Sequence, residues 1–249
     1  MALIQQRPQK PRVSGRTNVL DKGMGLAQLQ DTLQTCGSYI DVIKLGWGTA
    51  LITPQLKEKI DLIKSFDIEP CLGGTLFEYA YITGKLDEYT QLLKELELNL
   101  IEISDGSITL AQQEKNEIIN QFAQDFTVYS EVGSKDDKVI VSPSKWVEQI
   151  KSEIAAGAQK VILEGRESGT AGLYRADGEI RMGLVDEVIH SGIEFNKLIF
   201  ETPKKAQQVW MLKQYGAEVN MGNIAYEEVV SLETLRLGLR ADTLMHFHG

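Results

Sequence analysis

The sequence predicts an α/β protein with a single-domain (β/α)₈ barrel, from its length and from two features of its hydrophobic pattern. The chain has 249 residues, a usual length for one such barrel and enough for a core without disulfides or structural metals. Short apolar runs alternate with longer amphipathic segments, as in a repeated strand-then-helix unit. Several short runs, such as Val161-Ile162-Leu163, are apolar at successive positions, which is typical of parallel strands buried on both faces.

Eight of the short apolar runs are predicted strands. They are residues 18–20, 41–45, 69–72, 100–103, 127–130, 160–163, 197–200 and 218–220. The alternative is an open doubly wound sheet, which needs fewer strands and usually has a glycine-rich dinucleotide turn after the first. The first turn here, Asp21-Lys22-Gly23-Met24-Gly25, lacks that spacing. Eight strands, each followed by a helix, therefore favour the barrel.

The segments between the strands are predicted helices. They are residues 25–36, 53–66, 85–96, 111–122, 142–157, 180–190, a helix that opens at Thr202-Pro203, and residues 227–239. Thr53-Pro54, Ser142-Pro143 and Thr202-Pro203 are each typical of an N-cap followed by a first-turn proline. No linker divides the chain, so we expect one barrel domain over residues 16–249, preceded by a flexible arm over residues 1–15.

Composition and charge exclude several classes of function. The net charge of −9 argues against a nucleic-acid or anionic-membrane partner, because both would repel the protein. Cys36 and Cys71 have no metal-like spacing and are expected to be small buried residues. The first 16 residues contain no apolar run of signal-peptide length, and no stretch is long enough to span a membrane. These features favour a cytoplasmic enzyme.

Charged residues lie at or near almost every predicted strand end, where the active site of a (β/α)₈ barrel is built. They are Lys22, Lys44, Glu102, Glu131, Lys135, Glu164, Arg166 and Glu201. Charge in a partly desolvated barrel mouth is costly unless it is paired. Carboxylates and cations together at one mouth are what an anionic substrate and a divalent cation would need.

Three of these carboxylates, Glu102, Glu131 and Glu164, follow one another on successive strands. Hard oxygen ligands from neighbouring strand ends suit Mg²⁺, so we predict that the three bind this metal. The alternative is that each pairs with a nearby lysine or arginine.

The turns after the third and eighth strands predict substrate binding. Their candidate residues, with the cations that would support them, are Gly74, Thr75, Asn220, Asn223, Lys22 and Arg166. Backbone N–H groups at a helix start favour phosphate, and basic side chains strengthen that preference. The alternative is tight turns with no ligand.

Lys44 and Lys135 are the candidate catalytic residues. A lysine at a strand end can be a general acid, a general base, a Schiff-base nucleophile or a purely electrostatic group, and spacing cannot choose among them. The histidines carry less information. His190 closes a predicted helix, and His246 and His248 are expected to be solvated in the tail. Trp47 either walls the pocket or packs against the barrel.

Long segments of the chain resemble the phosphosulfolactate synthase family. The segments are Val19-Leu20-Asp21-Lys22-Gly23, Asp41 to Thr49, Gly73 to Glu78, Glu102 to Gly106, Ser130 to Lys135, Glu164 to Gly169, and the tail from Leu232 to Thr243. The resemblance runs from about Arg12 to Thr243. Two departures, Thr202 for the usual alanine and Ala241 for the usual glycine, change no charge.

The resemblance implies a (β/α)₈ barrel that adds sulfite to phosphoenolpyruvate, needs Mg²⁺ and yields (2R)-phospho-3-sulfolactate. It implies a homo-oligomer, and a product that feeds either coenzyme M or sulfolactate, a choice that the sequence leaves open. Lys135 corresponds to the general acid of the family's Glu-Val-Gly-x-Lys segment. Lys44, Lys22 and Arg166 would hold the phosphate, carboxylate and sulfite groups, in an order that stays open.

Two other functions are weighed against this one. A barrel aldolase, or another carbon–carbon lyase acting on a phosphorylated small acid, could use Lys44 or Lys135 as a Schiff base, which borohydride would trap. A binding or scaffold protein would have no need to keep dense mixed charge at its strand ends.

Overall fold

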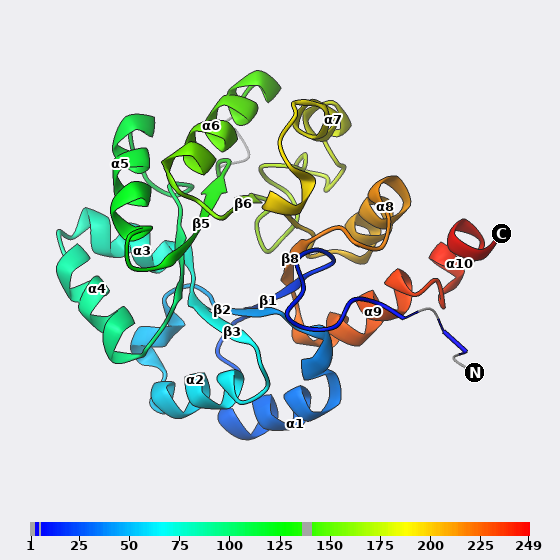
Figure 1. Ribbon diagram of the computed structural model, residues 1–249, viewed down its shortest axis with the longest axis horizontal. Coiled ribbons are helices and arrows are strands. Elements are labelled where there is room, and N and C mark those ends of the chain that lie inside the picture. The colour runs from blue at the N-terminus through cyan, green and yellow to red at the C-terminus, as the bar shows by residue number, and fades with distance from the viewer. Residues whose placement is uncertain (1–2, 5, 136–140) are drawn as a thin grey trace.

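The structure, a computed structural model, describes residues 3–4, 6–135 and 141–249. The strands are β1 (Thr17–Asp21), β2 (Val42–Leu45), β3 (Glu69–Leu72), β4 (Leu100–Ile103), β5 (Thr127–Val132), β6 (Lys160–Leu163), β7 (Leu198–Glu201) and β8 (Met221–Ile224). All pair in parallel with their neighbours, and β8 pairs with β1 to close the barrel. Figure 1 shows helices surrounding this barrel. The predicted (β/α)₈ fold is therefore confirmed.

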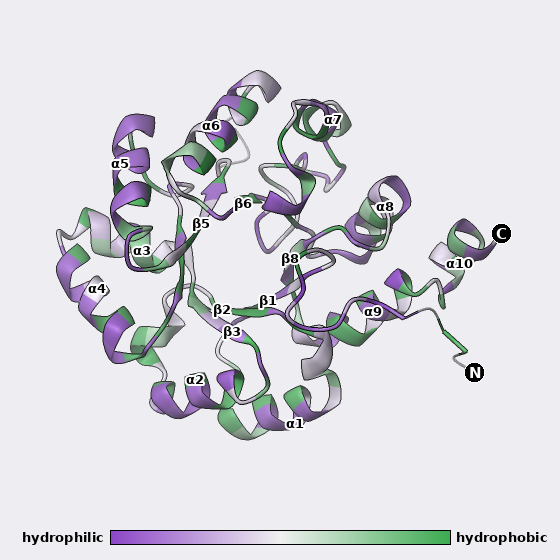
Figure 2. Cartoon of the chain, in the orientation of Figure 1, coloured by the Kyte–Doolittle hydropathy of each residue, from purple (hydrophilic) through white to green (hydrophobic). Residues whose placement is uncertain are grey.

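The α-helices lie outside the strands. They are α1 (Leu26–Cys36), α2 (Leu56–Lys64), α3 (Gly74–Ile82), α4 (Leu86–Glu95), α5 (Gln112–Phe122), α6 (Pro143–Ala156), α7 (Met182–His190), α8 (Lys205–Tyr215), α9 (Val229–Arg236) and α10 (Ala241–His248). Short 3₁₀ helices include η2 (Thr49–Ile52) and η4 (Tyr226–Glu228). Along helices such as α2 and α4, hydrophilic residues alternate with hydrophobic ones (Figure 2). This pattern lets one face pack on the barrel while the other meets solvent.

Alternation along the strands places an apolar layer inside the barrel and a polar layer above it. The apolar layer consists of Val42, Cys71, Leu100, Tyr129, Ile162 and Ile199, all buried. Side chains two residues apart on a strand point to the same face. The next inward positions toward the C-terminal ends therefore belong to Lys44, Gly73, Glu102, Glu131, Glu164 and Glu201. The polar layer is thus set by strand periodicity.

Several helix starts differ from the predicted ones. Ser142 is the N-cap of α6 and accepts a hydrogen bond from Lys145 N, as its sequence predicts. Thr53 instead follows η2, and α2 begins only at Leu56. Likewise, α8 begins at Lys205, past the Thr202-Pro203 pair. The helices α3 and α10 were not predicted; α3 starts at a Gly-Gly pair that is more typical of a turn, and α10 carries His246 and His248 in exposed positions.

The eighth strand lies three residues later than predicted. Residues 218–220 precede β8, and the buried strand runs from Met221 through Gly222 and Asn223 to Ile224. Glycine and asparagine are poor strand formers, which is why the sequence pattern favoured a turn there. The pairing of β1 with β8 shifts register within this stretch, and Asn223 has a φ of 54°. A bulge of this kind redirects side chains at a barrel rim.

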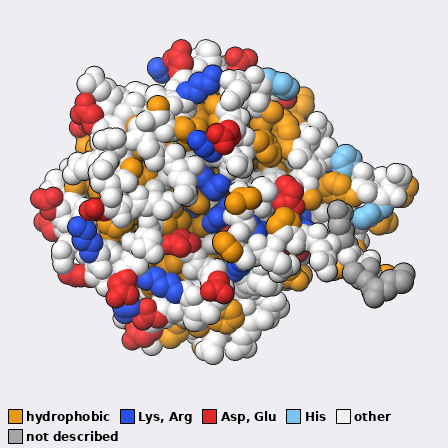
Figure 3. All heavy atoms as spheres, viewed as in Figure 1, with side chains coloured by type: hydrophobic (Ala, Val, Ile, Leu, Met, Phe, Trp, Pro, Cys, Tyr) orange, Lys and Arg blue, Asp and Glu red, His pale blue; other side chains and the backbone are white. Residues whose placement is uncertain are grey.

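The described part of the N-terminal segment crosses the N-terminal end of the barrel. Arg12 pairs with Asp41 at 3.2 Å, and Gly15 N donates to Glu218 O at 2.7 Å. Figure 1 shows this segment in dark blue in front of β1 and β8, and Figure 3 shows basic side chains gathered toward the middle of the same view. The flexibility expected of residues 1–15 stays a prediction. Cys36 and Cys71 are buried and free, as expected.

Within the described ranges, no helix has both the length and the apolar composition that a membrane span requires.

Candidate active site

A polar pocket opens at the C-terminal ends of the strands, above the apolar layer. Its volume is about 380 Å³, including the part open to solvent. The sequence-predicted site residues that line it are Lys44, Gly74, Thr75, Glu102, Glu131, Lys135, Glu164, Arg166 and Asn223. Glu201 and Trp47 line it too. These residues come from seven strands or the turns that follow them and meet in one place, as the barrel topology requires.

Lys44 lies at the centre of this pocket. Its Nζ is 3.1 Å from Glu201 Oε1, 3.2 Å from Glu102 Oε2 and 3.9 Å from Glu131 Oε2. Burial alone would lower the pKa of Lys44, but Glu102, Glu201 and Glu131 outweigh it and raise the pKa well above its usual value. Lys44 is therefore favoured as a cation, and its ion pairs join strands on different sides of the mouth.

Glu102 is held by the backbone of α3 as well as by Lys44. Its Oε1 accepts a hydrogen bond of 2.8 Å from Gly74 N. Burial raises the pKa of Glu102 to about 7, although Lys44 acts in the opposite direction. Glycine is needed at position 74, because a Cβ there would collide with Ser104. The absence of a side chain at Gly74 thus lets the start of α3 lie close to Glu102 and Ser104.

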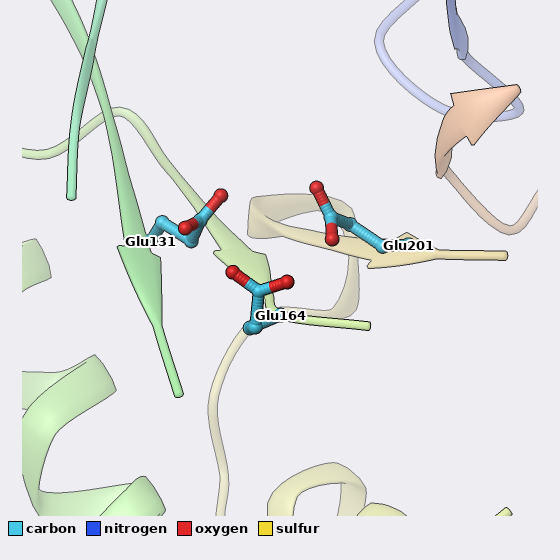
Figure 4. Close-up of side chains that lie close together, drawn as sticks. All are labelled: Glu131, Glu164 and Glu201. Atoms are coloured by element: carbon cyan, nitrogen blue, oxygen red, sulfur yellow. The ribbon is translucent and has the colours of Figure 1, made fainter. Parts of the chain in front are cut away.

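Glu131, Glu164 and Glu201 form a second group of carboxylates in the same pocket. Each offers one oxygen such that the three atoms lie within 4.8 Å of one another, and all three residues are buried. Figure 4 shows their carboxyl groups facing one another from β5, from the turn after β6 and from β7. The predicted metal trio of Glu102, Glu131 and Glu164 stays a prediction. The converging group contains Glu201 in place of Glu102, which is engaged by Gly74 and Lys44.

The carboxylates of this group differ in their preference for protons. Burial alone would raise the pKa of Glu131, but Lys135 and Lys44 lower it to about 2. Burial and the carboxylates of Glu131 and Glu201 raise the pKa of Glu164 well above its usual value. Carboxyl groups outnumber ammonium groups in the pocket, so one of them keeps its proton unless another cation enters.

The three-carboxylate group fits a hard divalent cation such as Mg²⁺. Such cations prefer oxygen ligands, and the group supplies oxygens from neighbouring strands. Glu164 Oε2 is buried and forms no hydrogen bond with the described residues, whereas Glu131 Oε1 has the Lys135 ammonium group 3.4 Å away. Buried oxygens without donors are costly, and a cation would relieve that cost as well as the excess of negative charge.

Lys135 enters the pocket from the turn after β5. Its Nζ lies 3.4 Å from Glu131 Oε1 and 3.4 Å from Glu78 Oε1, and it donates to Thr75 Oγ1 at 3.5 Å. Burial would lower the pKa of Lys135, but Glu131, Glu164 and Glu78 raise it overall. The side chain is one quarter exposed, so this cation is accessible to a ligand in the pocket.

Three pocket residues have left-handed backbone conformations, which residues other than glycine rarely adopt. Their φ angles are 54° for Trp47, 57° for Arg166 and 54° for Asn223. Such conformations cost free energy and cluster at functional sites. Asn223 is nine-tenths buried, and its Oδ1 has no hydrogen-bond partner among the described residues. The strain and the unpaired oxygen together make this rim a candidate for ligand binding.

Arg166 lines the pocket, Lys22 lies next to the lining residue Trp47, and both cations are exposed. Lys22 Nζ is 5.2 Å from the centroid of the Trp47 ring, a cation–π distance. Arg166 N donates to Glu164 Oε1 at 2.5 Å. Trp47 therefore walls the pocket and also supports Lys22, which is not itself among the described lining residues.

Asn220 is not brought together with the other predicted residues. It precedes β8, and its Nδ2 donates to the carbonyl oxygens of Asn196 and Leu198 at 3.1 and 3.0 Å. Its Oδ1 accepts from Arg16 N at the N-terminal end of the barrel. The prediction placed Asn220 at the wrong end of the barrel because it ended the eighth strand too early.

The sequence analysis assigned no role to two acidic residues near the site. Glu201 ends β7 as the other carboxylates end their strands, so its position was a usable signal. Glu78 lies inside α3, a helix that was not predicted, and contacts the lining residue Lys135.

Comparisons with known proteins agree on one family. Residues 5–242 match the family model of (2R)-phospho-3-sulfolactate synthase (ComA). The chain is 42% identical over 239 residues to the phosphosulfolactate synthase of Bacillus subtilis (strain 168), with 95% of each covered. It is 42% identical over 250 residues to that of Methanothermobacter thermautotrophicus, with 97% of this chain and 96% of that protein covered.

Solved structures share the fold at much lower identity. The 3-hexulose-6-phosphate synthase from Salmonella typhimurium aligns with a TM-score of 0.54 at 12% identity, over 93% of this chain and 94% of that one. At this level of identity the likeness shows the barrel and nothing about the reaction.

Proposed function

The chain belongs to the phosphosulfolactate synthase family, and we propose that it adds sulfite to phosphoenolpyruvate in a Mg²⁺-dependent reaction that gives (2R)-phospho-3-sulfolactate. The observation that carries the proposal is the meeting of family-like segments at one pocket. Lys44, Glu102, Glu131, Lys135 and Glu164 come from four such segments, and all line it. Family likeness and pocket geometry thus select the same residues.

The proposed reaction forms one carbon–sulfur bond and releases nothing. The sulfur lone pair of sulfite attacks the methylene carbon C3, and the electrons of the C2–C3 double bond move into C1–C2 and the carboxylate. The resulting aci-carboxylate carries extra negative charge on its oxygens. A proton added to C2 then completes the product, with the phosphate retained. Catalysis therefore requires cations near the carboxylate and an acid near C2.

We assign the cations by their positions in the pocket. Lys44, at its centre, would face the carboxylate where charge develops, and preorganised charge of this kind lowers the barrier. Lys22 and Arg166, at the edge, would hold the outer anionic groups, with Gly74, Thr75 and Asn223 completing the binding surface. Lys135 would donate the proton to C2, the role that the resemblance to the family implies. Its accessible ammonium group supports that role.

We assign the metal to Glu131, Glu164 and Glu201, whose oxygens converge. Bound there, Mg²⁺ would supply Lewis-acid stabilisation of negative charge on the substrate. The protein's own part is to orient these carboxylates. Gly165 N donates to Glu201 Oε2 at 2.9 Å, and Arg166 N donates to Glu164 Oε1. These backbone contacts hold the two side chains in place.

The Schiff-base alternative is less well supported. A lysine attacks a carbonyl only as the neutral amine, whereas Glu102 and Glu201 raise the pKa of Lys44, and Glu131 and Glu78 contact Lys135. Both lysines would remain ammonium ions at neutral pH. Failure of borohydride to trap an adduct with a carbonyl substrate would agree with this reasoning.

A direct assay tests the proposed function. Purified protein is mixed with phosphoenolpyruvate, sulfite and Mg²⁺, and the loss of the enol absorbance is followed. We expect the loss to require both substrates. Consumption of phosphoenolpyruvate without sulfite, or none with it, would refute the proposal.

A further inference from the structure

Lys135 is the one proposed acid, and contacts on several sides determine where its ammonium group lies. Glu131 contacts it from β5 and faces the pocket. Glu78 and Thr75 contact it from α3 at 3.4 and 3.5 Å. Glu78 is not among the described residues that line the pocket. Its direct contact with a lining residue is the ion pair with Lys135, so this lysine can carry an effect of Glu78 to the substrate.

Glu78 is itself held in one orientation. It is only 2% exposed, and its Oε1 accepts a hydrogen bond of 2.5 Å from Ser104 Oγ at the end of β4. Its Oε2 is buried and has no hydrogen-bond partner among the described residues. A buried carboxylate is costly unless a cation offsets it. The cation in contact with Glu78 is Lys135, so the two side chains constrain each other.

Gly106, in the turn after β4, supports the stem of Lys135. A Cβ at position 106 would lie 3.1 Å from Cγ and 3.2 Å from Cδ and Cε of Lys135. The Lys135 N–H also donates to Gly106 O at 3.2 Å. The lysine stem therefore runs directly over a backbone that has no side chain, and even a methyl group there would displace it.

We propose that Glu78 is a positioning residue that, with Ser104 and Gly106, directs the ammonium group of Lys135 toward C2 of the substrate. The proposal rests on the proposed function, in which the Lys135 ammonium gives its proton to C2. In that step the C1–C2 π electrons form the new C–H bond, and the neutral amine later regains a proton from water. Without the charge of Glu78, the attraction of Glu131 is unopposed and draws the ammonium group away from α3.

The test begins with Glu78→Gln, which keeps the size of the side chain and can keep a hydrogen bond to Ser104. General-acid catalysis contributes about 100-fold or more, so a misdirected acid should lower kcat by about tenfold. We expect KM for phosphoenolpyruvate to change by less than about twofold, because Glu78 holds no substrate. The solvent deuterium isotope effect on kcat should rise as proton transfer becomes rate-limiting.

Two further variants separate positioning from folding. Gly106→Ala changes no charge but displaces the lysine stem. Like Glu78→Gln, it should therefore lower kcat and raise the isotope effect. It decides the matter if Glu78→Gln does not fold. Glu233→Gln is the matched control, because Glu233 is buried and paired with Arg7 at the other end of the barrel. Its kcat and isotope effect should match those of the wild type.

A double-mutant cycle shows whether Glu78 acts through Lys135. In a Lys135→Met background, Glu78→Gln should lower kcat by less than about twofold further, because the group it positions is gone. Independent, multiplicative losses would overturn the positioning role, as would a wild-type kcat and isotope effect in both Glu78→Gln and Gly106→Ala. Wild-type turnover by Lys135→Met alone would instead refute the acid assignment within the proposed function.

Discussion

Lys44 Nζ lies 3.1 Å from Glu201 Oε1, so a side chain of β2 meets one of β7 across the mouth of the closed barrel. Strands that are not neighbours are thereby joined by an ion pair at the centre of the pocket. The same lysine also contacts Glu102 of β4 at 3.2 Å. We therefore expect both the chemistry and the local stability of the mouth to depend on this one ammonium group.

Lys44→Met should lower activity and stability together. Loss of one preorganised charge at a developing oxyanion typically costs about 100-fold in kcat. Removing one partner of a buried ion pair lowers the free energy of unfolding by about 3–5 kcal/mol. Turnover and urea unfolding measure these effects, with Lys57→Met, at an exposed ion pair, as the control. Near wild-type turnover would show that Lys44 does not face the reacting charge.

The metal assignment distinguishes Glu201 from Glu102. EDTA should abolish activity and Mg²⁺ should restore it. Glu201→Gln should weaken Mg²⁺ binding by about tenfold or more, whereas Glu102→Gln should change it by less than about threefold, because Gly74 and Lys44 engage Glu102 instead. Calorimetric titration with Mg²⁺ gives both values. Equal weakening of Mg²⁺ binding in the two variants would support Glu102 as a ligand as well. Activity that survives EDTA would refute the metal requirement.

Arg166→Gly should separate stability from substrate binding. The left-handed backbone at Arg166, with a φ of 57°, lowers the free energy of unfolding by about 1 kcal/mol relative to glycine at the same position. We therefore expect Tm to stay the same or rise, while KM for phosphoenolpyruvate increases by about tenfold through the lost guanidinium group. Arg166→Lys, which keeps the charge, serves as the comparison. A lower Tm with an unchanged KM would contradict the assignment.

Lys160, at the N-terminal end of β6, should titrate near pH 8. Burial and the nearby Arg16 lower its pKa to about 8. Since the folded pKa lies below the unfolded value of about 10.4, the charged form costs stability below pH 8. The contribution of Lys160 to the free energy of unfolding therefore rises as pH increases from about 8 to about 10.4.

The titration can be followed by NMR after reductive ¹³C-methylation of the lysines. A resonance that titrates near pH 8 should be missing from Lys160→Met and present in a control variant at the exposed Lys213. Burial also lowers the pKa of Lys10 to about 8, so a second such resonance is expected. The prediction fails if every lysine signal titrates together above pH 10.

The meeting of the charged residues could be predicted from the sequence, because all strands of a parallel barrel end at the same rim. Lys44, Glu131, Lys135 and Glu164 follow from strand positions alone. Which carboxylates group together could not be predicted in the same way. Glu102 accepts a hydrogen bond from the N–H of Gly74, the first residue of α3. The Gly-Gly pair at the start of this helix is more typical of a turn, so the contact could not be anticipated.

The error at the eighth strand has a similar physical origin. Gly222 and Asn223 belong to a bulged, buried strand, where packing overrides the low strand propensity of both residues. Because the predicted strand ended at Asn220, this residue was assigned to the C-terminal end of the barrel, whereas it lies at the N-terminal end. Asn223, which lies in the same bulged strand, lines the pocket. The Gly-Asn pair that made the strand hard to predict therefore also contributes a residue to the site.

The central claim is that this pocket joins sulfite to phosphoenolpyruvate and protonates C2, and NMR in D₂O tests it most directly. Wild-type protein is incubated with phosphoenolpyruvate, sulfite and Mg²⁺, and ³¹P, ¹H and ¹³C spectra are recorded. We predict one product that retains its phosphate ester, has a sulfonated C3 and carries a single deuterium at C2. Release of inorganic phosphate or pyruvate, or unchanged phosphoenolpyruvate, would contradict the claim.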